Sequence, residues 1–354
     1  MLNKIFAAIR TQTYCTKESC LTSACNSLTK KVSDLSKFVF SSLYAIYDFP
    51  RSTNPVTHQR EFRWIPTFVE QSMGDITYRT LLKKDGRVVK ETDTVFGTYS
   101  KLVHEIGKGL VEKCPRKDLS FEFEVVENSE EEAWCLPGGK IAITLGLIRN
   151  LEEEKRDFGM TRSFTLQEKI AAVLSHEITH AAARHVARTI ELRYFLFFIF
   201  KIMEFSVNFF FCERFNSEIK ELEKIEVKTQ QQRQKIVELQ KKRDSTSHMI
   251  FTIFDYIVYR WIFINYNLCS SRSHELEADK YGMHLIHKVG SEQNNIGLDK
   301  SSAESAVWLQ HYFSKSYPTS TGWLARVLNL LSTHPSHDER LAANQATWQE
   351  LKTT

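Results

Sequence analysis

The chain has 354 residues, of which 42% are hydrophobic and 25% charged, a balance typical of a globular protein rather than a disordered one. Its formal net charge is only +4 and no dense basic patch occurs, so we expect no nucleic-acid partner. Seven unevenly spread cysteines do not predict a disulfide framework in a chain of this length.

The first 50 residues predict a targeting or interaction segment. Residues 1–17 carry three basic residues and no acidic one, which fits a mitochondrial transit segment and fits an ordinary basic amino terminus equally well. No continuous apolar stretch of the kind found in a Sec signal peptide follows. The apolar run 38–49 is too short to span a bilayer, and we expect Pro50 to end it.

Two β-rich runs follow in the middle of the chain. Phe121, Phe123 and Val125 alternate with glutamates, which is the period of a half-buried strand. Next comes EEAWCLPGGKIAITLGLI, in which a Pro-Gly-Gly turn separates two apolar runs. This pattern predicts a β-hairpin.

A helix with a marked start carries the first chemical motif. Thr165 and Glu168 fit a capping box that opens the helix. Further along the helix is HEITH, in which His176 and His180 share one face and can reach one metal ion. In such a motif the histidines bind zinc, and Glu177 takes a proton from the water on the metal. A solvent-facing helix with two unrelated histidines is the alternative, and the apolar residues flanking the motif argue against it.

Zinc at a catalytic site needs a third protein ligand, and SRSHELEADKYG offers one. Glu275 and Asp279 lie on one helical face, with a small alanine between them that lets a second helix approach. Glu275 can reach the metal, and Asp279 can accept a hydrogen bond from a ligand histidine and so orient its ring. His274 is the alternative ligand, about 100° away around the helix. Glu277 points away from this face and is expected to be a solvent charge.

His334, Arg340 and His185 are further candidates for a place near the metal. In STHPSHDERL, His334 lies beside a proline with Arg340 soon after, an arrangement that could stabilise a tetrahedral oxyanion. His334 could instead occupy the open metal position and hold the enzyme inactive. A polar loop followed by a helix start explains the same residues without chemistry. We expect His185, five residues after the second histidine of HEITH, to be a packing residue or to support a ligand.

Two apolar runs, 192–211 and 249–268, approach the length of a membrane-spanning helix but contain charges. Buried core helices, spanning helices and helices lying in the membrane interface all fit this composition. The cost of ionisable groups in lipid favours the buried and interfacial alternatives. Between the runs, residues 218–247 are highly charged, and apolar residues at alternating spacings of three and four predict a solvated helix or a short coiled-coil arm. Thr229 and Gln232 are polar positions in that seam.

Four motifs in chain order carry a family resemblance: LPGGKIAITLGLI, HEITH with a following RH, SRSHELEAD and THPSHDER. Together they resemble the HtpX and CAAX-prenyl-protease group of zinc metallopeptidases. Within that group the sequence is most similar to the mitochondrial inner-membrane stress peptidases of the Oma type. The resemblance spans roughly residues 60–345.

The resemblance implies roles for individual residues. It makes Glu275 the third zinc ligand and places His334 and Arg340 near the oxyanion. It also implies an edge strand to which an extended substrate adds by β-augmentation. The residues implied for that edge are Leu136, Pro137, Gly138 and Gly139.

The expected fold is mainly α-helical with a small β-sheet: a gluzincin-type zinc metallopeptidase with an HExxH helix, an edge-strand hairpin and an inserted apolar helical excursion. Residues 51–345 are expected to form a single metallopeptidase domain, interrupted by the apolar helices of 192–268. The expected cofactor is one Zn²⁺ per chain.

The expected activity is zinc-dependent cleavage of misfolded or membrane-associated proteins, in membrane protein quality control or a stress response. A catalytically degenerate peptidase that serves as a chaperone or scaffold is the alternative. The resemblance implies membrane association, at the mitochondrial inner membrane in a eukaryote and at the cell membrane or in the cytoplasm in a bacterium. The sequence leaves open whether the chain forms homo-oligomers.

Overall fold

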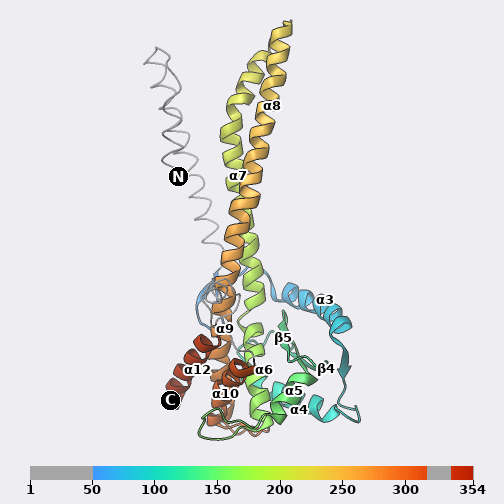
Figure 1. Ribbon diagram of the computed structural model, residues 1–354, viewed down its shortest axis with the longest axis vertical. Helices are drawn as coiled ribbons and strands as arrows, with labels where there is room; N and C mark the ends of the chain where they lie inside the picture. Colours follow the sequence, from blue (N-terminus) through green and yellow to red (C-terminus); the bar gives the residue numbers. More distant parts are fainter. Residues whose placement is uncertain (1–50, 317–335, 354) are drawn as a thin grey trace. The chain divides into compact units, whose positions relative to one another are not determined.

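The structure is a computed structural model that describes residues 51–316 and 336–353. The predictions for residues 1–50 and for His334 lie outside the described residues. The described part is mainly helical with two small sheets, which confirms the predicted fold class at that level (Figure 1).

Four short strands form the main sheet. They are β3 (Arg87–Val89), β4 (Glu122–Glu127), β5 (Ala133–Leu136) and β6 (Lys140–Thr144). Their order is β3-β4-β6-β5, with β4 and β6 parallel and the other two pairs antiparallel. The predicted strand and hairpin are therefore confirmed, and β5 lies at an edge of the sheet. A separate antiparallel pair consists of β1 (Arg51–Thr53) and β2 (Arg60–Phe62).

The turn between β5 and β6 is buried beneath α3 (Thr67–Asp85). Gly138 adopts a φ of +81°, a backbone angle that residues other than glycine rarely adopt. A Cβ on Gly74 of α3 would stand 1.8 Å from the carbonyl oxygen of Pro137. Glycine at both positions therefore lets the helix cross directly over the turn and hold the edge strand in place.

Helices surround the sheet and the HEITH segment. They are α4 (Gly97–Val111), α5 (Leu145–Glu153), α6 (Leu166–Ala182), α9 (Arg260–Gly290), the 3₁₀ turn η2 (Lys300–Glu304), α10 (Ser305–Ser316) and α12 (His337–Lys352). HEITH lies on α6, which packs against α4, α9 and α10. Ile170, Leu174 and Ile178 of α6 are fully buried. Burial of one such side chain contributes about 1.5 to 3 kcal/mol to the free energy of folding. The predicted capping box of Thr165 and Glu168 is confirmed at its start.

Arg184 separates α6 from α7 (His185–Glu223), with a left-handed φ of +59°. This conformation is uncommon outside glycine, and buried contacts hold it. The buried guanidinium donates to Glu191 Oε1 at 3.0 Å, to the carbonyl oxygen of Ile65 at 3.0 Å and to Glu70 Oε2 at 3.3 Å. The interruption between the HEITH helix and α7 therefore depends on one arginine.

After α7 the chain turns and returns as α8 (Gln230–Ile253), so residues 218–247 do not form one continuous helix. Thr229 caps α8, and Gln232 completes a capping box with it. The two polar positions assigned to a coiled-coil seam thus begin a new helix, because a capping box and a heptad seam share the same spacing. Beyond the first turns of α7, the buried residues of this helical hairpin are Cys212, Ile219, Leu239 and Ile250.

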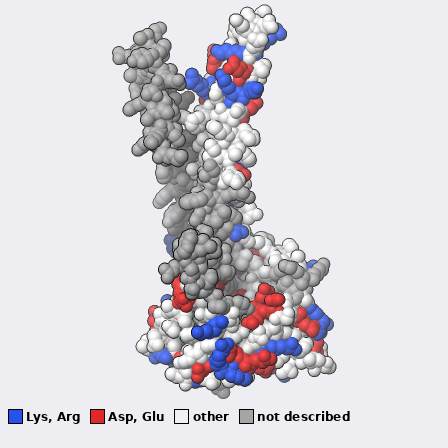
Figure 2. All heavy atoms as spheres, in the orientation of Figure 1, with Lys and Arg blue, Asp and Glu red and all other residues white. Residues whose placement is uncertain are grey.

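The apolar run 192–211 lies on α7 and is exposed. Among the described residues, the helical stretch Leu166–Glu223 is the one long and apolar enough to cross a membrane, and only 6% of its apolar window is buried. Phe198 is 55% exposed and Phe205 is 73% exposed, so the buried alternative for this run is wrong. On the face shown in Figure 2, uncharged side chains cover the middle of the α7–α8 hairpin and charged ones gather at its far end.

The second apolar run, 249–268, is not one regular α-helix. It contains the end of α8, the π-helix η1 (Phe254–Tyr259) and the start of α9.

Two of the charged groups on α7 pair with each other, since Lys201 Nζ lies 2.8 Å from Glu204 Oε2. The ammonium of Lys201 also lies 4.9 Å from the ring centroid of Phe251 on α8, which joins the two helices.

We expect Arg184→Leu to destabilise the protein by about 3 to 5 kcal/mol, because it leaves buried glutamates without their cation. The measurement is the free energy of unfolding from denaturant titration. Arg79→Leu, an exposed arginine on α3, is the matched control and should change stability by less than about 0.5 kcal/mol. Equal effects of the two substitutions would contradict the role given to the buried cluster.

Candidate metal centre

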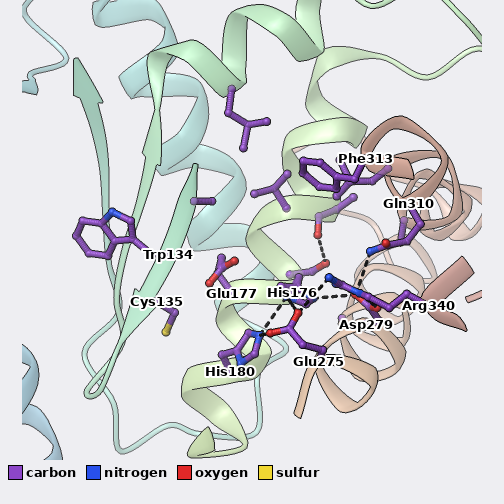
Figure 3. A pocket seen from close by; sticks show the side chains of 18 of the residues that line it. Trp134, Cys135, His176, Glu177, His180, Glu275, Asp279, Gln310, Phe313 and Arg340 are labelled. Atoms are coloured by element: carbon purple, nitrogen blue, oxygen red, sulfur yellow. Dashed lines mark hydrogen bonds and ion pairs between the residues drawn. The ribbon is translucent and has the colours of Figure 1, made fainter. Parts of the chain in front are cut away.

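Three side chains from two helices converge at the floor of a cleft. His176 and His180 come from α6, and Glu275 comes from α9. The Nε2 atoms of the two histidines lie 3.0 Å apart. Glu275 Oε2 lies 3.5 Å from His176 Nε2, and Glu275 Oε1 lies 3.6 Å from His180 Nε2. Figure 3 shows these side chains meeting beside the strand β5.

This arrangement fits a zinc ion. Tetrahedral zinc with bonds of about 2.0 to 2.2 Å separates its ligand atoms by about 3.3 to 3.5 Å, close to the three observed distances. Two imidazoles and one carboxylate are also a ligand set of catalytic zinc sites, which keep a fourth position open. His274, the alternative ligand, is buried and stacks on His185 with 4.3 Å between ring centroids.

Asp279 and Arg340 brace the ligands from the α9 side. Asp279 Oδ1 lies 2.9 Å from His176 Nδ1. Arg340, on α12, donates to both oxygens of Asp279 at 2.6 and 2.7 Å, and its third nitrogen lies 3.1 Å from Glu275 Oε2. Arg340 therefore holds two carboxylates in place, a role the sequence did not suggest; its expected place beside an oxyanion stays a prediction.

The charges around the ligands favour a cation. Burial opposes a charge on His176, but hydrogen bonds to Asp279 and Glu275 outweigh it and raise the pKa of His176 to about 10. Burial also acts to raise the pKa of Glu275, yet His176, His180 and Arg340 hold that pKa well below its ordinary value. An anionic carboxylate that attracts positive charge is suited to binding a divalent ion.

Glu177 lies on the cleft side of α6, between the ligands and the edge strand. The cleft has a volume of about 560 Å³, and Trp134 and Cys135 of β5 line it opposite the helices (Figure 3). Burial raises the pKa of Glu177 to about 7. A carboxylate with a pKa near neutrality can both accept and release a proton, as general acid–base catalysis requires.

The predicted substrate edge is shorter in the structure than the sequence implied. Only Leu136 of the four implied residues belongs to the edge strand. Pro137, Gly138 and Gly139 form the buried turn beneath α3. In the described part of the chain no strand pairs with the outer edge of β5, which comprises Ala133–Leu136; substrate binding there stays a prediction.

The expectation that Glu277 faces solvent is wrong. Its Oε2 atom lies 2.9 Å from His185 Nε2 and accepts a hydrogen bond of 2.7 Å from Arg188 Nη1. His185 in turn places its Nδ1 atom 2.8 Å from the Nδ1 atom of His180. Glu277 does point away from the face of Glu275, but residues of α7 contact that side of α9, and nothing in the local sequence reveals this.

Comparison with protein families decides the class of the chain. Residues 99–347, more than half of the chain, match the profile of peptidase family M48. The chain belongs to peptidase family M48. M48 peptidases are metal-dependent and typically use zinc, so the predicted resemblance to this group of metallopeptidases is confirmed.

Individual M48 relatives match over shorter stretches. The mitochondrial metalloendopeptidase OMA1 of Schizosaccharomyces pombe is 25% identical over 139 residues, which is 38% of this chain and 36% of the relative. OMA1 of Arabidopsis thaliana is 35% identical over 72 residues, or 20% of this chain and 12% of the relative. The β-barrel assembly-enhancing protease of Escherichia coli is 27% identical over 122 residues, which is 34% of this chain and 21% of the relative. These matches cover about a third or less of each relative's length.

We expect Glu275→Ala to lose zinc, because two histidines leave the ion under-coordinated. The loss of affinity should exceed the roughly 10 to 100-fold typical of losing a group that only orients a ligand. The measurement is zinc content after dialysis against a weak chelator. Lys280→Ala, an exposed residue of the same helix, is the control. If Glu275→Ala keeps zinc and His274→Ala loses it, His274 is the third ligand and Glu275 is not.

Proposed function

We propose that this M48 chain is a gluzincin-type zinc endopeptidase in which His176, His180 and Glu275 bind one zinc ion. The observation that carries the proposal is the triangle of three ligand atoms 3.0 to 3.6 Å apart, with Glu177 beside it in the same cleft. A purely structural zinc site would give Glu177 no task, since four-ligand closed sites exclude water.

Zinc, when bound, acts as a Lewis acid towards the scissile carbonyl and lowers the pKa of water towards neutrality. Glu177 takes the proton from the attacking water and returns it to the leaving amine. Asp279 fixes the ring of His176 through Nδ1, and Arg340 fixes Asp279. These contacts keep the ligand atoms in place while the proton moves.

The substrate binds as an extended strand along the outer edge of β5. Backbone groups of Ala133–Leu136 pair with the substrate, which supplies affinity without dependence on its side chains. Because β5 runs beside α6, the added strand crosses the cleft in front of Glu177. A polypeptide must be unfolded locally to add in this way, which suits misfolded proteins as substrates.

Membrane-associated proteins in quality control or a stress response are the proposed substrate class. The exposed phenylalanines of α7 provide an apolar surface that suits contact with lipid. Two of the relatives are named as mitochondrial metalloendopeptidases, which supports a mitochondrial location in a eukaryotic host. Together with the apolar surface of α7, this location makes the mitochondrial inner membrane the proposed site. A degenerate peptidase acting as a chaperone or scaffold is the competing function, and an intact Glu177 argues against it.

We expect Glu177→Gln to keep zinc and lose cleavage of an unfolded protein such as casein by about 10² to 10⁴-fold, because the substitution removes the proton acceptor but no metal ligand. Zinc content and the initial rate of cleavage are measured on the same preparations. Glu105→Gln, an exposed residue of α4, is the matched control. Unchanged cleavage in Glu177→Gln would remove the proposed base, and a wild type that binds zinc without cleaving would favour the scaffold.

We expect the wild-type protein to sediment with membranes after carbonate extraction. Replacing Phe198, Phe205 and Phe209 of α7 by serine should move it to the supernatant while zinc content stays the same, because no proposed ligand lies there. Replacement of the exposed Val227 and Val237, at the charged end of the hairpin, by serine is the control. This variant should stay in the membrane pellet. Wild-type protein that stays soluble without detergent would rule out the proposed association.

A further inference from the structure

His180 is held on the side opposite to the proposed metal by a second histidine. The Nδ1 atoms of His180 and His185 lie 2.8 Å apart, and His185 is only 2% exposed. The other ring nitrogen of His185 lies 2.9 Å from Glu277 Oε2. The two imidazoles and the carboxylate therefore form a continuous relay that starts at a proposed ligand.

The chemistry of the groups fixes the direction of the hydrogen bonds. A histidine that binds a cation through Nε2 carries its proton on Nδ1 and can only donate there. His185 must then accept through Nδ1, so its own proton is on Nε2. That proton is donated to Glu277, a carboxylate that only accepts when ionised. The relay thus selects one tautomer for each ring.

The outer end of the relay is anchored by a cation. Arg188 donates to Glu277 Oε2 at 2.7 Å, and its Nε atom lies 3.0 Å from Glu61 Oε2 on β2. The ring of His274 stacks on His185, with an angle of 4° between the two planes. These contacts come from α7, α9 and β2, so the position of His185 is set by three parts of the fold.

The other ligand histidine has a parallel arrangement. His176 faces Asp279, which is held by Arg340, while His180 faces His185 and Glu277, which is held by Arg188. The hydrogen-bonded contacts of each ligand histidine thus lead to a carboxylate that is paired with an arginine. The second route includes an additional imidazole, that of His185, which lies between His180 and Glu277.

We propose that His185 and Glu277 are positioning residues that hold His180 in the tautomer and orientation needed to bind the metal. The proposal rests on the proposed function in so far as His180 is a metal ligand. Neither residue touches substrate or metal, so both act through His180. Loss of such an outer partner typically reduces metal affinity by about 10 to 100-fold.

The test compares zinc affinity in His185→Phe, Glu277→Leu and Glu277→Gln by competition with a chromophoric chelator. His185→Phe keeps a flat ring but removes both nitrogens, and we expect affinity to fall about 10 to 100-fold. Glu277→Leu should weaken binding in the same direction. Glu277→Gln keeps an oxygen that accepts from His185 and should recover most of the loss.

A second measurement separates positioning from a general structural role. The visible absorption of the Co²⁺-loaded protein reports ligand geometry, and it should change in His185→Phe and Glu277→Leu and stay close to wild type in Glu277→Gln. His287→Phe, a half-buried histidine of the same helix α9, is the matched control for both measurements. Thermal unfolding of the metal-free proteins checks that each variant folds.

Wild-type zinc affinity and Co²⁺ absorption in His185→Phe would overturn the proposal. If His185→Phe does not fold, the Glu277 pair decides alone, and equal affinities of Glu277→Gln and Glu277→Leu would overturn it. Different results would refute the proposed function: a wild type that binds no zinc, or a Glu177→Gln variant that cleaves substrate as fast as the wild type. If the wild type passes those tests and His185→Phe has wild-type zinc affinity and Co²⁺ absorption, the proposed peptidase function stands. Only the positioning role of His185 and Glu277 is then refuted.

Discussion

The close packing of α6 against α9 is the contact on which the proposed metal centre depends. Its ligands come from two segments almost a hundred residues apart, and only this packing brings Glu275 to His176 and His180. Small residues make the approach close enough. Ala278 is fully buried, and a Cβ on Gly282 would stand 3.2 Å from the backbone nitrogen of His176. A longer side chain at either place would push the carboxylate away from the imidazoles.

Three arginines hold the side chains of this arrangement in place: Arg184 is buried, and Arg188 and Arg340 are partly buried. Arg340 holds Asp279 and Glu275 from α12, Arg188 holds Glu277 from α7, and Arg184 stabilises the interruption between α6 and α7. A buried charge is costly unless it is paired, and each of these guanidiniums contacts carboxylates. The guanidinium suits this task because its planar fork holds several acceptors in defined directions. The ligands are therefore fixed by charges as well as by apolar packing.

The α7–α8 hairpin follows a different rule from the rest of the fold. It lies in the sequence between the two halves of the metal centre, yet its apolar residues are turned outward. An exposed apolar surface of this kind marks a contact with another molecule or with lipid. Because α7 begins with His185 and Arg188, the first turn of this helix also supports the ligand His180. The proposed membrane contact and the proposed chemistry thus share one helix.

Local rules were enough for much of this protein. Thr165 and Glu168 mark the start of the HEITH helix, and Glu275 with Asp279 share a helical face, because capping and helical periodicity act over a few residues. The hairpin of β5 and β6 follows equally from its Pro-Gly-Gly turn.

Only the tertiary structure decided what each side chain meets. The sequence predicts a solvent charge at Glu277, but α7 supplies His185 and Arg188 as its partners. Arg340 contacts Asp279 and Glu275, two partners that its own loop sequence does not indicate. The spacing predicts Thr229 as a polar position of a coiled-coil seam, but in the structure it caps the start of α8. The reason is the same in each case: periodicity fixes the direction of a side chain from its own helix, whereas its partner comes from an element distant in sequence.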